Sequence, residues 1–413
     1  MLNPLFSVII PVLDNWELTR NCLESLREHS GDGGGELAFE VIVVDNASSD
    51  ATVTELQKLG ETLFGKNFQA LRFAENRNFG PACNAGATKA NAPLLFFLNN
   101  DTLLTPNWAP PLLAALDTDP APGAVGPLLL YENNTVQHLG VAFTLDSVSH
   151  LYRSFPADHP AVGRQRSLQA LTAAALMLPR SLFLEAGSFC ADYRNGFEDV
   201  DLCLHLRAKF GKKLVCVTKS VVYHLESRSM GRKDSDEQNA KLLHERCGGN
   251  FKADLHTFGI NDGFEAFISD NYGICLRLRQ EDEESLTSRA GNNPPGVWFN
   301  ILLKNPLWRA GRRHLIRELE KAGQGKEAVP LFLDLCVIER NAEVFKEGAI
   351  FAARHGDEEK CAYMAMRSKE LARSRKNRAR AYAKMHMAKA QDTVLLKLYE
   401  EKIRECFVKH SAG

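Results

Sequence analysis

Short, unbroken apolar segments alternate with helical patterns over the first hundred residues. The segments that read as buried strands are Phe6–Val12, Val41–Val44, Ala70–Phe73 and Leu94–Leu98. Between them, apolar residues recur at helical spacing or the composition favours helix, as over Trp16–Glu28, Thr52–Leu59 and Pro81–Ala90. Because strands that are apolar on both faces need helices on both sides, this pattern predicts an α/β fold with a mostly parallel sheet.

The pattern changes in the middle of the chain. It is irregular and partly alternating over 125–153, which predicts an extended or hairpin region. Further strands are expected at Ala173–Leu178 and Leu214–Tyr223, and helices at Ser181–Ala186 and Val200–Phe210.

Beyond about residue 250 the chain becomes helical. Gln280–Pro295 is polar, ends in Asn-Asn-Pro-Pro and is typical of a linker. Helices are expected at Gln324–Ile338, Ala342–Arg354 and Glu358–Arg373, in units that faintly resemble tetratricopeptide repeats. We therefore expect a first domain over 1–250, a connecting segment and linker over 251–295, and an all-helical region over 296–413.

Bulk composition narrows the class of protein. The 413 residues carry a formal charge of −1, which argues against attraction of the whole chain to nucleic acid. Ten cysteines stand singly, a pattern typical of reduced thiols in a cytoplasmic protein. No basic leader precedes the first strand, and no apolar run approaches the roughly 18 residues of a membrane span.

One stretch is strongly basic. From Arg367 to Lys389 there are nine Lys or Arg against one acid, Glu370. A solvated helix face is the simpler interpretation. The alternative is peripheral contact with anionic lipid on the inner face of the cytoplasmic membrane. Since Tyr382 is the only aromatic residue there, stacking on single-stranded nucleic acid is disfavoured.

Acidic residues follow two of the predicted strands. Asp45 and Asp101 come directly after apolar runs or close to their ends, where ligands bind in open α/β sheets. The alternative for Asp45 is capping of its own turn. Asp50 is a plausible cap for the next helix.

A third acidic site lies in Gly196-Phe-Glu-Asp-Val-Asp-Leu202. It places Glu198, Asp199 and Asp201 within four residues, beside apolar neighbours. Such crowding costs desolvation and repulsion, so the acids serve either a site or a helix start, where carboxylates are favoured.

Together these segments resemble the family 2 glycosyltransferases, with their GT-A fold, over about residues 5–250. The motifs that carry the resemblance are Ser7-Val-Ile-Ile-Pro-Val, Val43-Val-Asp-Asn-Ala-Ser-Ser-Asp50, Glu75-Asn-Arg-Asn-Phe-Gly80, Asn99-Asn-Asp101 and the acidic segment 196–202. The resemblance implies transfer of a sugar from a nucleotide donor.

The resemblance also assigns donor contacts. Asp45 would accept from the imide N–H of uracil or thymine, and Pro11 and Val12 would form the wall of the base pocket.

Diphosphate contacts are expected at the next helix start. Arg77, Asn78 and Asn84 flank it, where amides and a guanidinium suit phosphate oxygens; a solvated turn is the alternative. Arg228 and Ser229 are further candidates.

The metal motif departs from the family's pattern. Asn99-Asn100-Asp101 stands where relatives carry Asp-x-Asp, so only Asp101 is anionic. His224, after the last strand, is a candidate second ligand, which makes Mn²⁺ attractive beside Mg²⁺. The alternative for His224 is a hydrogen-bonded structural residue.

Inverting transfer needs a general base, which typically contributes ~10²–10⁴-fold. The resemblance places it in the Glu198-Asp199 pair. We assign the base to Asp199, acceptor orientation to Glu198, and a helix-turn role to Asp201.

The sequence thus predicts an inverting hexosyl- or deoxyhexosyltransferase that uses a UDP- or dTDP-sugar. The acceptor would be a hydroxyl of a saccharide, a lipid-linked saccharide or a protein, in cell-surface polysaccharide or glycan synthesis. The alternative is a catalytically weak scaffold that binds nucleotide sugars and recruits partners through its helical tail. Nucleotidyltransferases and redox Rossmann enzymes are disfavoured, because no Gly-rich loop follows the first strand.

Overall fold

The computed structural model describes residues 3–30, 38–225 and 236–407. Contacts divide the chain into two compact units. The first comprises Met1–Ala142 and Val148–Phe251, and the second comprises Phe143–Ser147 and Lys252–Gly413.

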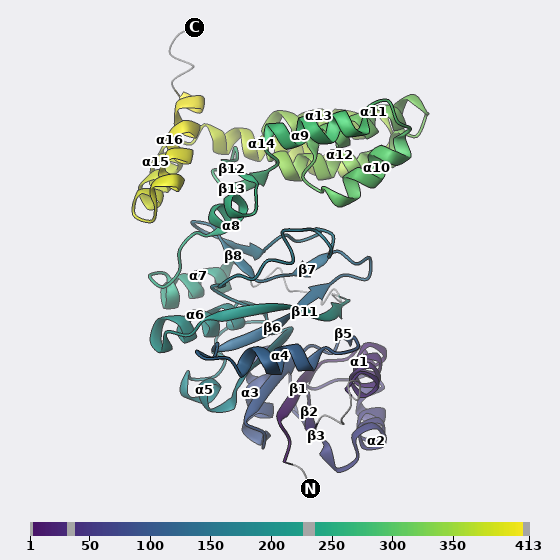
Figure 1. Cartoon of the computed structure of the whole chain (residues 1–413), viewed down its shortest axis with the longest axis vertical. Helices are drawn as coiled ribbons and strands as arrows, with labels where there is room; N and C mark the ends of the chain where they lie inside the picture. The colour runs from purple at the N-terminus through teal and green to yellow at the C-terminus, as the bar shows by residue number, and fades with distance from the viewer. Residues whose placement is uncertain (1–2, 31–37, 226–235, 408–413) are drawn as a thin grey trace. The chain divides into compact units, whose positions relative to one another are not determined.

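A mixed sheet forms the centre of the first unit (Figure 1), with strand order β3-β2-β1-β4-β10-β6-β11-β5 and β7 beside β6. Its strands are β1 (Phe6–Val12), β2 (Phe39–Asp45), β3 (Phe68–Arg72), β4 (Leu94–Leu98), β5 (Thr102–Leu104), β6 (Ala124–Leu130), β7 (Val136–His138), β10 (Ala175–Pro179) and β11 (Leu214–His224). The first four pair in parallel, as does β6 with β11, whereas β10 runs antiparallel to both β4 and β6.

Helices cover both faces of this sheet, as the apolar pattern predicts. α1 (Trp16–Glu28), α2 (Thr52–Phe64) and α4 (Ala109–Leu116) bury their apolar sides with alternate strand residues in one core. α3 (Phe79–Lys89) and α5 (Arg180–Glu185) lie against the other face. There the Phe97 ring is 4.9 Å from that of Phe183. At Gly86, a Cβ would lie 2.5 Å from Ile9 Cγ2, so only glycine allows α3 to approach the sheet this closely.

The fold class predicted from the sequence is confirmed, and most elements lie where the pattern puts them. The helix expected from Val200 begins earlier, as α6 (Glu198–Phe210), and a further helix, α7 (Asp236–Cys247), comes after β11. The irregular middle region forms β6 and β7 and the short strands β8 (Val141–Phe143) and β9 (Val148–His150).

The second unit joins a small hairpin to a set of helices. The hairpin pairs β12 (Glu265–Ile268) with β13 (Ile274–Arg277). The helices are α8 (Leu255–Asn261), α9 (Gln280–Ala290), α10 (Pro295–Lys304), α11 (Arg309–Lys321), α12 (Gly325–Glu339), α13 (Ala342–Arg354), α14 (Glu358–Arg375), α15 (Arg378–Lys389) and α16 (Thr393–Phe407). No helix within the described ranges is long and apolar enough to cross a membrane.

The polar stretch expected as a linker differs from expectation, because most of it is the helix α9. Its polarity reflects exposure on one side. On the other side, Glu283 accepts a 2.8 Å hydrogen bond from Arg309 Nε, and Ala290 is buried. A helix held by an ion pair and few apolar contacts carries little hydrophobic periodicity, so the pattern resembles a linker.

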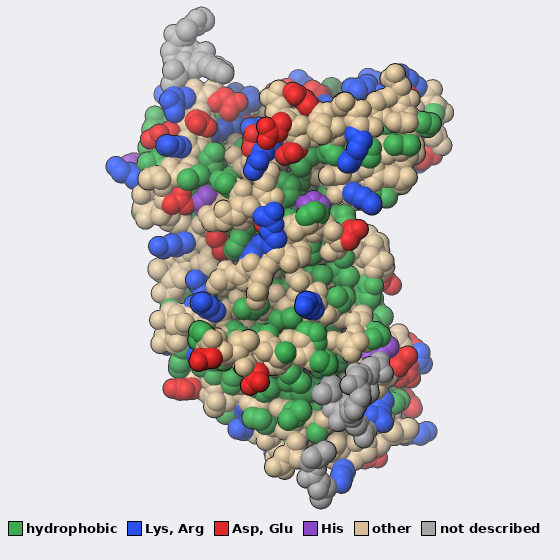
Figure 2. Space-filling view, viewed as in Figure 1, with side chains coloured by type: hydrophobic (Ala, Val, Ile, Leu, Met, Phe, Trp, Pro, Cys, Tyr) green, Lys and Arg blue, Asp and Glu red, His purple; other side chains and the backbone are tan. Residues whose placement is uncertain are grey.

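The basic stretch spans the end of α14 and most of α15. Arg375 lies 3.8 Å from Asp270, Arg380 lies 3.8 Å from Asp146, and Lys384 pairs with the same Asp146. Part of its charge is therefore neutralised locally. Figure 2 likewise shows basic and acidic side chains interspersed over the face in view, in keeping with the near-zero net charge.

Candidate functional site

Asp45 is the last residue of β2 and is 3% exposed. Its Oδ1 accepts a 2.8 Å hydrogen bond from Ser48 N, and its Oδ2 pairs with Arg72 at the end of β3. Val12 is its register partner on β1. Asp45 therefore caps its own turn and also pairs with the half-exposed guanidinium of Arg72, and its contact with a nucleotide stays a prediction.

Asp50, by contrast, works as a cap. Its Oδ1 accepts from Thr52 N at 3.0 Å, and its Oδ2 accepts from Trp16 N at 2.8 Å. One carboxylate thus secures the first turns of both α1 and α2.

Asn46 holds the loop that leads into α3. Its side chain donates to Asn76 Oδ1 at 2.8 Å and accepts from Arg77 N at 2.8 Å. The Arg77 side chain stays exposed, with its guanidinium 4.9 Å from the centre of the Phe73 ring. Asn78 precedes α3 with φ +66°, a backbone conformation that asparagine tolerates better than most residues.

Two further asparagine side chains connect α3 to the segment around residues 189–195. The side chain of Asn84 donates to Phe189 O at 2.8 Å and accepts from Phe189 N at 3.0 Å. Asn195 Oδ1 accepts from Phe79 N at 2.9 Å. The carboxamide of Asn84 is therefore engaged by backbone, and its contact with a diphosphate stays a prediction.

Asp101 and His224 meet although 123 residues separate them. β5 pairs with β11 so that His224 is the register partner of Thr102. This brings His224 Nε2 to 3.1 Å from Asp101 Oδ1 and 3.4 Å from the amide nitrogen of Asn99. Asn100 turns instead to α1, where it donates to Thr19 Oγ1 at 2.9 Å.

Two of these side chains offer ligand atoms for a divalent cation. Asp101 presents a carboxylate oxygen and His224 an imidazole nitrogen, a mixed pair that suits Mn²⁺, whereas Asn99 turns its amide nitrogen, which is not a metal ligand, toward His224. Neighbouring ligands of an octahedral ion at about 2.1 Å lie roughly 3 Å apart, close to the separation of the Asp101 and His224 atoms. His224 Nδ1 is buried without a hydrogen-bond partner among the described residues.

The predicted base lies at the start of α6. Asp199 is partly exposed; its Oδ1 accepts from Val200 N at 2.8 Å and its Oδ2 from Ala173 N at 2.9 Å. Glu198 is buried and accepts from Gly196 N at 2.7 Å. Ala174 O, one residue on from Ala173, accepts from Asn99 N at 2.9 Å. Asp199 is thus linked through two residues of backbone to the Asn99–Asp101 turn.

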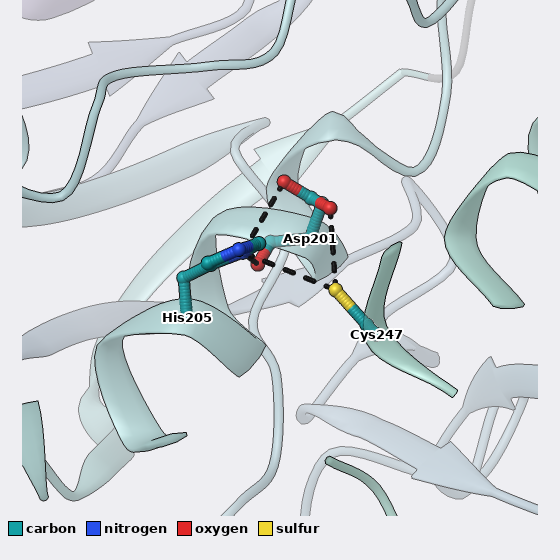
Figure 3. A group of neighbouring side chains, drawn as sticks. All are labelled: Asp201, His205 and Cys247. Carbon is teal, nitrogen blue, oxygen red and sulfur yellow. Dashed lines mark hydrogen bonds and ion pairs between the residues drawn. The ribbon is translucent and has the colours of Figure 1, made fainter. Parts of the chain in front are cut away.

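Asp201 forms a separate buried cluster with His205 and Cys247 (Figure 3). Cys247 Sγ lies 3.2 Å from Asp201 Oδ1, and His205 Nδ1 lies 3.4 Å from Asp201 Oδ2. Both carboxylate oxygens also accept from Arg246, at 2.9 and 3.2 Å. The phenol of Tyr193 donates to Oδ1 at 3.2 Å.

This cluster does not fit a metal. The guanidinium of Arg246 already occupies the carboxylate and would repel a cation. Burial, with the nearby carboxylate of Asp201, raises the pKa of the Cys247 thiol to about 12, so the thiolate that a metal needs is disfavoured. Asp201 is therefore more than a helix-turn residue: its contacts with Arg246 and Cys247 anchor α7 to α6 two residues along from Asp199.

Sequence reasoning missed several residues of this site. Arg72, Asn46, Asn195 and Asn239 act through partners far along the chain; Asn239, for example, donates to Arg194 O and Gly196 O at 3.1 and 3.0 Å. Adjacency to Asp45 could have drawn attention to Asn46, but nothing in the pattern indicates the others. Arg228 and Ser229 lie outside the described residues.

Comparison with known proteins supports the sequence motifs. Residues 7–154 match the family model described as glycosyl transferase family 2. The match covers about the first third of the chain, where the sequence is similar to that family.

Two curated relatives extend the match beyond the family 2 segment. Protein y4gI of Sinorhizobium fredii is 31% identical over 251 residues, 59% of this chain and 27% of that protein. The O-antigen biosynthesis protein RfbC of Myxococcus xanthus is 30% identical over 233 residues, 55% and 18% of the two chains. The chain therefore spans less than a third of the length of either relative.

Solved structures show a weaker likeness. The crystal structure of GalNAc-T7 with UDP, GalNAc and Mn²⁺ aligns over 59% of this chain and 48% of that chain, with 18% identity and a TM-score of 0.46. The segment similar to this family lies in the first unit, whose mixed sheet has helices on both faces, as the sequence motifs predict.

Proposed function

We propose that the protein is an inverting glycosyltransferase that moves a hexosyl or deoxyhexosyl group from a UDP- or dTDP-sugar to an acceptor hydroxyl. The observation that carries the proposal is the backbone connection from Asp199 through Ala173 and Ala174 to Asn99. It joins a carboxylate with access to solvent to the turn that bears the metal candidates.

The donor's base would lie against Pro11, Val12 and Asp45. Asp45 offers an acceptor and Arg72 a donor side by side, which matches the adjacent N–H and carbonyl groups of uracil or thymine. The proposed contacts of the diphosphate region are Arg77, Asn78, Asn84 and Asn100. Two of these already donate hydrogen bonds within the protein, Asn84 to Phe189 O and Asn100 to Thr19 Oγ1.

Asp101 and His224 are proposed to hold Mn²⁺ or Mg²⁺. When bound, such an ion supplies positive charge beside the diphosphate leaving group. Asp199 accepts the proton of the attacking hydroxyl. Glu198 is proposed to orient the acceptor, and it does so by fixing the turn at Gly196, from which it accepts a hydrogen bond. The proton moves from the acceptor oxygen to a carboxylate oxygen of Asp199 as the new glycosidic bond forms. The bond between the anomeric carbon and the diphosphate oxygen breaks with its electron pair on that oxygen, and the nucleoside diphosphate leaves.

We propose that residues 1–250 carry this activity, that residues 251–295 connect the two parts of the chain, and that residues 296–413 form a separate helical region. A saccharide, lipid-linked or protein acceptor in cell-surface polysaccharide synthesis is proposed from the similarity to RfbC. Membrane contact through 367–389 remains a prediction.

The proposal is tested by release of nucleoside diphosphate from a panel of nucleotide sugars with Mn²⁺, using wild type and Asp199→Asn. We expect one donor to be hydrolysed or transferred by wild type. Asp199→Asn should bind that donor equally well in a thermal-shift titration, yet turn over about 10²–10⁴-fold more slowly. Glu185→Gln, at the end of α5, is a matched control. Retained turnover in Asp199→Asn would remove Asp199 as the base; donor binding without turnover in wild type would favour the scaffold.

A further inference from the structure

A pair of histidines lies beside the proposed site and takes no part in the roles assigned above. His138 is the last residue of β7 and is 1% exposed; His150 is the last residue of β9. Their Nδ1 atoms are 2.6 Å apart, and the rings meet edge to face at 4.9 Å. So short a separation requires one ring to donate and the other to accept.

The other side of His138 determines which ring donates. Its Nε2 lies 3.2 Å from Thr172 N, whose N–H can only donate. Nε2 therefore carries no proton, and the neutral ring has its proton on Nδ1, where it donates to His150. Burial, together with the nearby imidazoles of His150 and His224, holds the pKa of His138 well below its ordinary value, so the ring is neutral at physiological pH.

Thr172 begins a three-residue segment whose members each contact a different part of the site. Thr172 N donates to His138, Ala173 N donates to Asp199 Oδ2 at 2.9 Å, and Ala174 O accepts from Asn99 N at 2.9 Å. Consecutive residues cannot move independently. A shift at Thr172 therefore displaces the donor of Asp199 and the acceptor of Asn99 as well.

We propose that His138 is a positioning residue, held in one tautomer by His150, that fixes the Thr172–Ala174 segment and thereby orients Asp199 relative to the Asn99–Asp101 turn. This inference rests on the proposed function for its catalytic consequence, but the clamp itself is a property of the fold. A displacement of about 1 Å at a reacting group can cost roughly 10²-fold in rate, so a residue that touches no substrate can still control turnover.

Two substitutions of His138 test the contacts of its two ring nitrogens one at a time. Gln at position 138 places its amide oxygen near the site of Nε2 and can still accept from Thr172. Asn places its amide near the site of Nδ1; it can still contact His150 but cannot reach Thr172. We expect kcat to fall about 10²-fold in His138→Asn, with the KM for donor changed less than about threefold, and to fall far less in His138→Gln.

Hydrogen exchange gives a readout that does not depend on turnover. Amide exchange over residues 170–176 should be faster in His138→Asn than in wild type and close to wild type in His138→Gln. His150→Ala, which removes the acceptor of Nδ1–H, should show an intermediate increase. His386→Asn, at an exposed position on α15, is the matched control for both measurements.

Unchanged exchange at Thr172–Ala174 in His138→Asn would overturn the proposal, and so would an unchanged kcat. Equal losses in the Asn and Gln variants would also overturn it, since general damage to the core does not distinguish the two nitrogens. If wild type releases no nucleoside diphosphate from any donor, the proposed function fails, and the exchange comparison still decides whether His138 holds the segment. Should His138→Asn not fold, His150→Ala is compared with His138→Gln: exchange over 170–176 that is no faster in His150→Ala than in His138→Gln would overturn the proposal.

Discussion

Asp101 Oδ1 and His224 Nε2 lie 3.1 Å apart at the point where β5 and β11 pair. This contact joins the Asn-Asn-Asp turn to the last residue of β11. It places an imidazole nitrogen next to the single carboxylate of that turn. His224 is therefore our proposed second ligand, supplied by a different strand.

Removing the side chain of either Asp101 or His224 should weaken the binding of Mn²⁺ measurably. We expect His224→Ala and Asp101→Ala each to raise the Mn²⁺ concentration needed for half-maximal donor binding by at least about 10-fold. The measurement is a thermal-shift titration of Mn²⁺ at fixed nucleotide sugar. His205→Asn is the matched control, because the cluster behind α6 is not expected to hold the ion; an equal effect there would contradict the assignment.

The cluster of Asp201, His205 and Cys247 should prove insensitive to metal. Because Arg246 occupies the carboxylate and the thiol is protonated, added Zn²⁺ should not raise the melting temperature through this site. Wild type and Cys247→Ser should therefore give the same thermal shift at each Zn²⁺ concentration. A stabilisation seen in wild type and lost in Cys247→Ser would show that a metal binds there.

The Asp201–Arg246 pair should respond unequally to loss of its two members. The side chain of Asp201 is 4% exposed and that of Arg246 is 36% exposed. Arg246→Met leaves a buried carboxylate without its counter-charge and should cost about 3 kcal/mol, the lower end for buried pairs. Asp201→Asn leaves a guanidinium that water can reach and should cost about 1 kcal/mol. Urea denaturation monitored by tryptophan fluorescence compares the two, and the reverse order would contradict this account.

Asp50 should make the stability of the first unit depend on pH. Partial burial opposes its charge, but hydrogen bonds from Thr52 and Trp16 outweigh that effect and hold the pKa of Asp50 below its ordinary value. A carboxyl whose pKa is lower in the folded state contributes stability that is complete above its unfolded pKa of about 3.9 and is lost as pH falls through the folded pKa.

The variant that tests this pH dependence is Asp50→Asn, which keeps one acceptor oxygen and loses the other. We expect it to cost about 1–2 kcal/mol at pH 7, with the difference from wild type shrinking as pH falls below about 4. Melting temperatures between pH 3 and pH 7 provide the check. Glu55→Gln, exposed on α2, should show no such trend; a wild-type advantage that is constant with pH would contradict the role of the Asp50 charge.

Local pattern was sufficient to locate the strand ends and hence Asp45 and His224. Apolar runs that stop at a polar residue reflect burial on both faces, which each segment carries in its own sequence. The same logic was insufficient for Asp199. Helix capping and a site role were alternatives in the sequence. The structure shows that the carboxylate accepts from Val200 N at the start of α6 and also from Ala173 N, and its role as the base stays a prediction.

By itself the sequence determined the α/β domain, its family motifs and the helical region that follows, because hydrophobic periodicity and strand-end residues are local properties. Tertiary structure alone decided that His224 reaches Asp101, that Arg246 neutralises Asp201, and that His138 holds Thr172. Each of these contacts joins residues 34 to 123 positions apart. Pairing at such separations follows from strand order and helix packing, which no single segment encodes.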